Sequence, residues 1–239
     1  MRTVAIIQAR MGSTRLPGKM LLPLAGKPLI QRLLERIHRA TLLDAMVLAV
    51  PSKDLDAFLP CSAAASLYGY PGDESDLVGR YLSAAQAYHA DLIVRIPGDN
   101  PCVDPAFIDR AIRSYLLRPQ LFVSTLMACW TERVFINGLG GEVFSLSRLH
   151  WLDQATRGHA LYREHPHRLF QDQHLIDSWE HYQRSGDRAK TILLDVNTQE
   201  DYDKIAKMYE TLYPVNPAFT AADIVAYFQE VLYETSQRG

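Results

Sequence analysis

The chain has 239 residues, of which 48% are hydrophobic, and a formal net charge of −2. This length allows a sizeable core in one α/β domain, and the near-neutral charge argues against general nucleic-acid binding, which needs a basic surface. Three widely spaced cysteines favour neither a disulfide framework nor a zinc site. No signal peptide and no apolar segment of membrane-spanning length is visible, so we expect a cytoplasmic protein without membrane insertion.

The first strand is predicted at Val4–Ile7, a short apolar run rich in β-branched residues. The loop that follows carries three cations and two glycines: Arg10, Arg15, Lys19, Gly12 and Gly18. Glycine lets the backbone approach phosphate oxygens, and Arg and Lys bind phosphate by charge. The loop therefore predicts a polyanion site, and the alternative is a solvated basic loop.

The spacing of this loop separates it from two common phosphate motifs. Five residues lie between Gly12 and Gly18, which is longer than a Walker loop allows, and Met20 follows Lys19 where a Walker loop has Ser or Thr. The dinucleotide pattern G-x-G-x-x-G is also absent. The sequence therefore indicates a nucleotide loop of a different kind.

Strands and helices alternate through the rest of the first half. Further strands are predicted at Ala45–Val50 and Asp91–Ile96. Apolar residues recur at helical spacing over Pro28–Ile37, Leu77–Tyr88 and Pro105–Tyr115. This alternation favours parallel strand pairing in a layered sheet.

The second half is less regular. Strands are predicted at Phe122–Thr125, Gly141–Phe144 and Thr191–Leu194, and helices in pieces from Leu146 to about Phe170, from Gln199 to about Tyr213 and from Phe219 to about Tyr233. We therefore predict one Rossmann-like domain over residues 1–239, with an inserted arm around residues 125–185 that serves dimerisation.

The segment Ile6–Lys19 resembles the start of the sugar cytidylyltransferases. The nearest match is the spore-coat polysaccharide type, related to the CMP-KDO and CMP-N-acylneuraminate synthetases. Similar motifs follow in order at Leu24–Pro28, Gly79–Tyr81, Val94–Pro101, Asp104-Pro105, Gly138-Leu139, Glu142–Phe144, Asp195–Thr198 and Glu200-Asp201. The resemblance implies a GT-A-like three-layer α/β sandwich with a mostly parallel central sheet and a small dimerisation arm, acting as a homodimer.

The resemblance also implies an activity. CMP would pass from CTP to a sugar, such as a KDO-like or nonulosonic acid, with release of pyrophosphate, for surface polysaccharide or glycan synthesis. The implied nucleotide-binding residues are Ala9, Arg10, Gly12, Ser13, Arg15, Lys19, Gly72, Arg80 and Gly98. Arg15, Lys19 and Asp99 would be catalytic, because cations offset the charge on the α-phosphate and the departing pyrophosphate. Asn137, Gly138 and Glu142 would face the sugar.

A magnesium site is implied by two acidic segments. Asp99 follows a predicted strand, where ligands of open α/β sheets collect. In isolation Gly98–Pro101 fits a turn better, and the resemblance reverses that preference. Asp195 and Asn197 lie two apart, so an extended backbone directs them to one side. Related enzymes usually have Asp where this chain has Asn197, whose amide oxygen brings no negative charge.

Three departures from the family pattern bear on activity. Asn137 and Gly140 stand where relatives carry Asp, and Pro71 stands where they often carry Arg. Asn197, Gly140 and Pro71 motivate one alternative, a non-catalytic or retuned nucleotide-sugar-binding relative. A second alternative is a nucleotidyltransferase that uses another base, because base choice depends on contacts that the sequence alone does not resolve.

A group of histidines between His150 and His181 includes His165-Pro166-His167, which looks like a metal pair. No cysteine is nearby and the helical spacing of a zincin is missing, so we do not predict a metal there. Glu164-His165 matches a pair in relatives, which favours a structural or sugar-side role.

Overall fold

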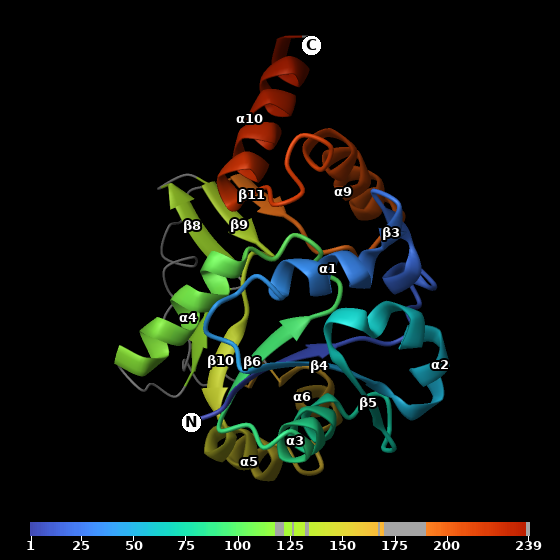
Figure 1. Ribbon diagram of the computed structural model, residues 1–239, viewed down its shortest axis with the longest axis vertical. Helices are drawn as coiled ribbons and strands as arrows, with labels where there is room; N and C mark the ends of the chain where they lie inside the picture. The colour runs from blue at the N-terminus through green and yellow to red at the C-terminus, as the bar shows by residue number, and fades with distance from the viewer. Residues whose placement is uncertain (118–121, 126, 132–133, 167, 170–189, 238–239) are drawn as a thin grey trace.

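The computed structural model describes residues 1–117, 122–125, 127–131, 134–166, 168–169 and 190–237. Its central sheet has six strands in the order β5-β4-β1-β6-β10-β7 (Figure 1). These strands are β1 (Thr3–Gln8), β4 (Ala45–Pro51), β5 (Ser66–Tyr70), β6 (Leu92–Pro97), β7 (Val123–Ser124) and β10 (Glu142–Ser145). The pairs β1–β4, β1–β6 and β4–β5 are parallel, whereas β10 runs antiparallel to both β6 and β7. The predicted mostly parallel sheet is confirmed.

Helices cover both faces of this sheet and make three layers (Figure 1). The longer helices are α1 (Leu29–Ile37), α3 (Leu77–Ala87), α4 (Pro105–Leu117), α5 (Leu146–Ala155), α9 (Gln199–Leu212) and α10 (Ala221–Gln237). Short elements are α2 (Leu55–Phe58), α6 (Ala160–Glu164) and the 3-10 turns Lys19–Leu21, Ser52–Asp54 and Leu59–Ala64.

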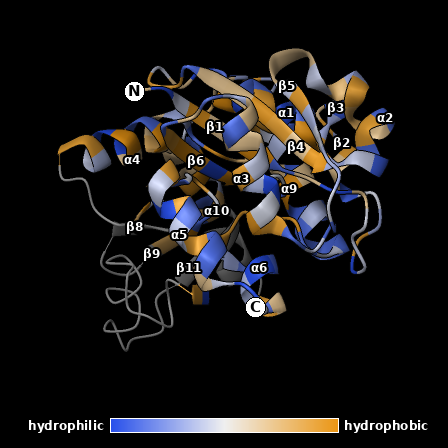
Figure 2. Cartoon of the chain, turned by 90° about the horizontal axis from the view of Figure 1, so that it is seen from below, coloured by the Kyte–Doolittle hydropathy of each residue, from blue (hydrophilic) through white to orange (hydrophobic). Residues whose placement is uncertain are grey.

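The sheet separates two hydrophobic clusters, as the alternation of side chains along β1 requires. Ala5 and Ile7 pack with α1, α4, α9 and α10, whereas Val4 and Ile6 pack with α3 and α5, and all four are fully buried. The central strands are correspondingly hydrophobic in Figure 2. A strand buried on both faces explains why Val4–Ile7 reads as a continuous apolar run.

The structure contains strands that periodicity did not predict. β5 is one, because Ser66 and Gly69 weaken its apolar pattern and its residues are only partly covered. β8 (Met127–Thr131) and β9 (Val134–Asn137) pair with β11 (Lys190–Leu193) in a second sheet of order β11-β9-β8. A two-stranded hairpin, β2 (Pro23–Leu24) with β3 (Lys27–Pro28), precedes α1. The late strand predicted at Thr191–Leu194 therefore exists but belongs to the smaller sheet.

The residues of the predicted arm, around 125–185, belong to different parts of the fold. β10 lies in the central sheet and α5 packs on α3, whereas residues 170–189 lie outside the described residues. The arm and its use in dimerisation stay predictions. Three of the noted histidines, His167, His174 and His181, also lie outside the described residues. None of the helices in the described ranges combines the length and apolarity needed to cross a bilayer.

Candidate functional site

The candidate site lies at the carboxyl ends of β1 and β6. The chain passes from β1 to β4 on one side and places β6 on the other, which makes a topological switch point where open α/β sheets bind ligands. A cavity of about 510 Å³ occurs there. Its lining includes most of the residues predicted from the sequence: Ala9, Arg10, Ser13, Arg15, Lys19, Arg80, Gly98, Asp99, Asn137, Glu142, Asp195 and Asn197. Gly12, Gly72 and Gly138 do not line it.

Gly98 brings the ends of the two strands together. Its amide donates to the Gln8 carbonyl oxygen at 2.8 Å, and a Cβ at this position would overlap that oxygen. Only glycine fits such an approach, which explains why a glycine precedes Asp99.

The loop after β1 is held by buried partners. The Met11 amide donates to the Asp54 carboxylate at 2.9 Å, and the Arg80 guanidinium donates to the Ala9 carbonyl at 3.2 Å. Arg80 is 2% exposed, and Gly18 has a φ of +67°, which favours glycine. The loop therefore presents its cations from a backbone that Asp54 and Arg80 hold in place.

Lys19 lies at the centre of one charged cluster. Its ammonium donates to the Asp99 carboxylate and to the Val196 carbonyl, both at 2.7 Å, and more weakly to the Asn197 amide oxygen at 3.4 Å. Arg15 donates to the same amide oxygen at 2.8 Å. The structure thus brings together the predicted loop cations and the predicted metal-side residues, which are separated by 80 residues or more in the sequence.

Asp195 and Asn197 complete this cluster. The Asn197 amide donates to the Asp195 carboxylate. Burial, and next the negative charge of Asp99, raise the pKa of Asp195. The two side chains lie on one side of the backbone, as their spacing predicts.

The helix after this segment begins with a capping box. The Asp201 amide donates to the Thr198 hydroxyl, and the Asp201 carboxylate accepts from the Thr198 amide at 3.0 Å and from the Asn197 amide at 3.1 Å. The cap fixes the backbone of Asn197, so the start of α9 positions the metal-side residues.

Arg95 and Glu142 form a second charged pair in the same cavity. Their side chains are 7% and 4% exposed and form a salt bridge between β6 and β10. Burial alone would lower the pKa of Arg95, but the carboxylate of Glu142 raises it above the usual value. Tyr81 lies beside Arg95, with its ring centroid 5.8 Å from the guanidinium, and donates to Gln8 at 2.6 Å. Glu142 lines the cavity, but its carboxylate is already paired.

The segment before β10 contains two glycines that are tightly packed or have a positive φ. A Cβ at Gly140 would overlap the Thr125 hydroxyl and lie 2.5 Å from the Thr125 carbonyl oxygen. Gly138 has a φ of +100° and is buried. Both glycines are therefore explained by backbone packing, whereas Asn137 does reach the cavity.

Sequence reasoning missed several lining residues. Gln8, Thr14, Glu74 and Arg95 line the cavity, as do Glu164 and His165. Glu164 accepts from Arg10 at 3.3 Å, which places the noted Glu164-His165 pair opposite the nucleotide loop. Gln8 could have been predicted as a lining residue, because it is the first polar residue after the apolar run of the first strand.

The oxygen donors of the cluster fit a hard divalent cation. Two carboxylates and one amide, from Asp99, Asp195 and Asn197, are ligands that Mg²⁺ accepts. The Lys19 ammonium lies among these oxygens, so the place already attracts positive charge. No three His, Cys, Asp or Glu side chains gather as a metal-binding group in the part of the chain that is described.

Comparisons with known proteins agree with this geometry. The model of a family described as cytidylyltransferase matches residues 4–223. The spore coat polysaccharide biosynthesis protein SpsF of Bacillus subtilis is 32% identical over 218 residues, which cover 86% of this chain and 85% of that protein. A 3-deoxy-manno-octulosonate cytidylyltransferase of Trichlorobacter lovleyi is 38% identical over 126 residues, 53% of this chain and 50% of that enzyme.

Two solved structures have the same fold. A cytidylyltransferase from Leptospira borgpetersenii aligns with a TM-score of 0.79 and 27% identity, over 98% of this chain and 96% of its own. A CMP:2-keto-3-deoxy-manno-octonic acid synthetase complexed with CTP aligns with a TM-score of 0.61 and 18% identity, over 88% of this chain and 99% of its own.

Proposed function

The chain belongs to the cytidylyltransferase family, and we propose that it moves CMP from CTP to a hydroxyl of an acidic sugar for surface polysaccharide synthesis. In this reaction the sugar oxygen bonds to the α-phosphorus, the bond from the α-phosphorus to the bridging oxygen breaks, pyrophosphate leaves and the hydroxyl proton passes to solvent. The sugar class is supported by the relatives named for spore coat polysaccharide synthesis and for transfer to 3-deoxy-manno-octulosonate.

One observation carries the proposal. Arg15, Lys19 and Asp99 line one cavity at the carboxyl ends of β1 and β6, and the Lys19 ammonium contacts the Asp99 carboxylate at 2.7 Å. Cations placed beforehand where negative charge develops are the main source of catalysis in phosphoryl-type transfer. We therefore propose that Lys19 and Arg15 stabilise the negative charge that develops on the departing pyrophosphate.

Mg²⁺ is the proposed cofactor, held by Asp99, Asp195 and Asn197. When bound, it would neutralise charge on the phosphates. A solved structure of Rv0371c from Mycobacterium tuberculosis, at 17% identity, is a complex with manganese. In this chain the Lys19 ammonium contacts Asp99 at 2.7 Å, so the proposed metal ligand and the proposed catalytic cation lie next to each other.

The nucleotide end of the cavity is assigned to the loop after β1 and to Arg80, and the sugar end to Asn137, Glu142 and Glu164. We also propose a homodimer that uses the arm around residues 125–185, which light scattering would test. CTP is a cytoplasmic metabolite, so we propose that location for the enzyme.

The test measures pyrophosphate release with CTP and Mg²⁺ against a panel of acidic sugars, with their neutral counterparts as matched controls. Turnover with an acidic sugar, and none with its neutral counterpart, is expected. Parallel assays with UTP, GTP and ATP test the base, and equal rates with all four would contradict the cytidine assignment. Binding of CTP without turnover on any sugar would instead favour the non-catalytic alternative.

A further inference from the structure

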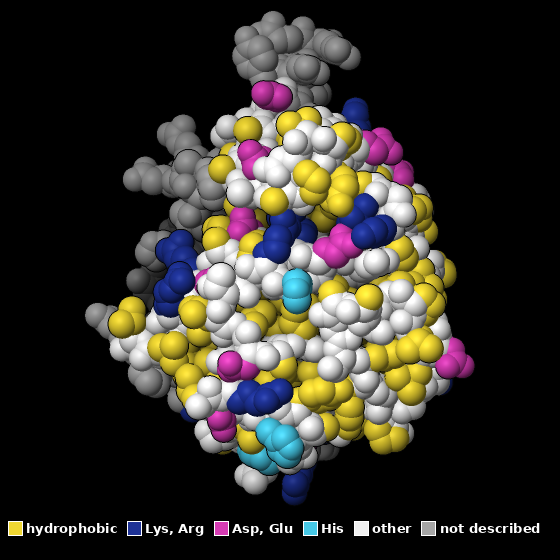
Figure 3. All heavy atoms as spheres, viewed as in Figure 1, with side chains coloured by type: hydrophobic (Ala, Val, Ile, Leu, Met, Phe, Trp, Pro, Cys, Tyr) yellow, Lys and Arg dark blue, Asp and Glu magenta, His cyan; other side chains and the backbone are white. Residues whose placement is uncertain are grey.

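A second pocket lies away from the catalytic cavity, between α1 and α9. Its volume is about 190 Å³, and three arginines, one carboxylate, two tyrosines and a proline line it: Arg32, Arg36, Arg39, Glu35, Tyr209, Tyr213 and Pro217. None of these residues lines the catalytic cavity. Figure 3 shows Lys and Arg side chains, with Asp and Glu side chains beside them, on the face of the molecule that carries α1 and α9.

Two of the arginines are fixed by the surrounding fold. Arg32 donates to the Leu24 carbonyl at 2.9 Å and to the Tyr213 hydroxyl at 2.6 Å. Arg36 donates to the Val103 carbonyl at 2.7 Å and to the Phe219 carbonyl at 2.9 Å, and its guanidinium stacks on the Phe219 ring. Both are at least 96% buried, so they form a rigid, positively charged wall.

The hydrogen bonding of this wall is incomplete. The Nη1 atom of Arg36 and the Nε atom of Arg39 are buried and have no partner among the described residues. Buried guanidinium donors without an acceptor are unfavourable, because they lose water and gain nothing in exchange. An acceptor that enters the pocket and lets these side chains adjust would satisfy them.

The positive charge of the pocket is also only partly balanced by acidic side chains. Arg32 pairs with Glu35 at 2.8 Å, but Arg36 and Arg39 form no ion pair within the described ranges. The nearby carboxylate of Asp104 accepts from the amides of Ala106 and Ala221 instead. Burial, and next the positive charge of Arg36, lower the pKa of Arg39. The pocket therefore has an excess of about two positive charges.

We propose that this arginine pocket binds a phosphoryl oxyanion, either free inorganic phosphate or the phosphate group of a larger molecule. Guanidinium groups match the oxygens of a tetrahedral oxyanion in pairs, and a doubly charged phosphate balances the excess charge. The volume admits one such group. This site is separate from the proposed transferase activity and does not depend on it.

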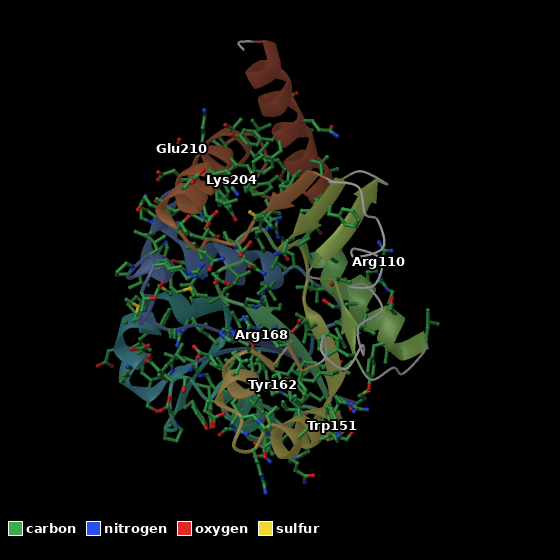
Figure 4. All side chains as sticks on the ribbon, turned by 180° about the vertical axis from the view of Figure 1, so that it is seen from behind. Arg110, Trp151, Tyr162, Arg168, Lys204 and Glu210 are labelled. Carbon is green, nitrogen blue, oxygen red and sulfur yellow. The ribbon has the colours of Figure 1, made fainter. Side chains whose placement is uncertain are left out.

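The test is calorimetric titration of the full chain with inorganic phosphate and with glycerol phosphate, at constant ionic strength set with chloride. Arg39→Gln removes a guanidinium that makes one long hydrogen bond within the described residues, 3.4 Å to the Pro217 carbonyl, so its effect on folding is small. Arg110→Gln is the matched control, because Arg110 is exposed on α4, on the other side of the molecule from Lys204 and Glu210 of α9 (Figure 4).

Binding that weakens at least tenfold in Arg39→Gln, stays unchanged in Arg110→Gln and partly returns in Arg39→Lys supports the proposal. Similar affinities for both probes identify the phosphate group of a larger molecule as the ligand, and binding of inorganic phosphate alone identifies the free ion. Equal affinity in Arg39→Gln and the unsubstituted protein, or no binding of either probe, would overturn it.

Discussion

The two charged clusters of the candidate catalytic cavity differ in how exposed their side chains are. Lys19 and Asp99 have side chains that are 9% and 25% exposed. The Lys19 ammonium also donates to Val196 and Asn197, and Arg15 donates to Asn197. Arg95 and Glu142 are 7% and 4% exposed and pair with each other. The first cluster keeps a carboxylate that solvent and ligands can reach, whereas the second has both charges buried. The first is therefore suited to chemistry and the second to holding β10 against β6.

The largest loss of unfolding free energy is expected when the buried Arg95–Glu142 pair is broken. Glu142→Gln leaves the Arg95 charge buried without its carboxylate, and such a loss costs about 3–5 kcal/mol of unfolding free energy. Urea unfolding measures it. Lys27→Met, which breaks the more exposed Lys27–Glu35 pair, should cost less than about 1 kcal/mol. Similar losses in the two variants would remove the distinction between buried and exposed pairs.

Substitutions in the more exposed cluster around Lys19 and Asp99 should change the rate of turnover instead of the stability. Lys19→Met is expected to lower kcat about a hundredfold, because it removes a cation placed for the leaving pyrophosphate. Pyrophosphate release measures the change, and circular dichroism checks that the fold is retained. Lys207→Met, at an exposed position of α9, is the control. Full activity of Lys19→Met would contradict the proposed mechanism.

A third experiment changes the charge of the more exposed cluster. Asn197→Asp places another carboxylate beside Asp195 and is expected to tighten Mg²⁺ binding about tenfold, since ligand charge tunes affinity. It also replaces a donor with a repelling charge, so the variant should unfold at lower temperature in EDTA and recover with Mg²⁺. Asn216→Asp, in an exposed turn, controls for added charge. An unchanged Mg²⁺ response would exclude position 197 from the metal site.

The smallest effect concerns the cap that holds Asn197. Burial alone would raise the pKa of Asp201, but hydrogen bonds from the Thr198 hydroxyl and from the amides of Asn197 and Thr198 hold it below its usual value. The stabilisation is therefore present near neutral pH and is lost as the pH falls below about 4. Asp201→Ala should cost about 1 kcal/mol at pH 7 and progressively less in acid, by urea unfolding. A difference that does not depend on pH would show that the carboxylate charge is not the cause.

Features that depend on neighbouring residues were predicted from the sequence pattern, whereas contacts between residues far apart in the sequence were not. The strands around Ile6 and Ile93 and the loop from Gly12 to Gly18 depend on neighbouring residues, so periodicity and composition located them. The meeting of Lys19 with Asp99 was expected only through family resemblance, because 80 residues separate them.

Contacts made by irregular or antiparallel segments left no local signal. The pairing of Arg95 with Glu142 depends on the antiparallel register of β10, which sequence periodicity does not encode. The unpartnered donors of Arg36 and Arg39 likewise follow from how α1 packs against segments more than 60 residues away.

The packing of Gly140 against Thr125 also limits how this sequence could change. A side chain at position 140 would meet both the hydroxyl and the backbone carbonyl of Thr125, so replacing Thr125 alone leaves the backbone obstacle in place. The amide of Thr125 is in turn bonded to the Gly141 carbonyl at 2.9 Å. An aspartate could therefore occupy position 140 only if the backbone at Thr125, directly after β7, moved aside. The identity of residue 140 is thus coupled to the path of the backbone at this edge of the sheet, and not only to the side chain at position 125.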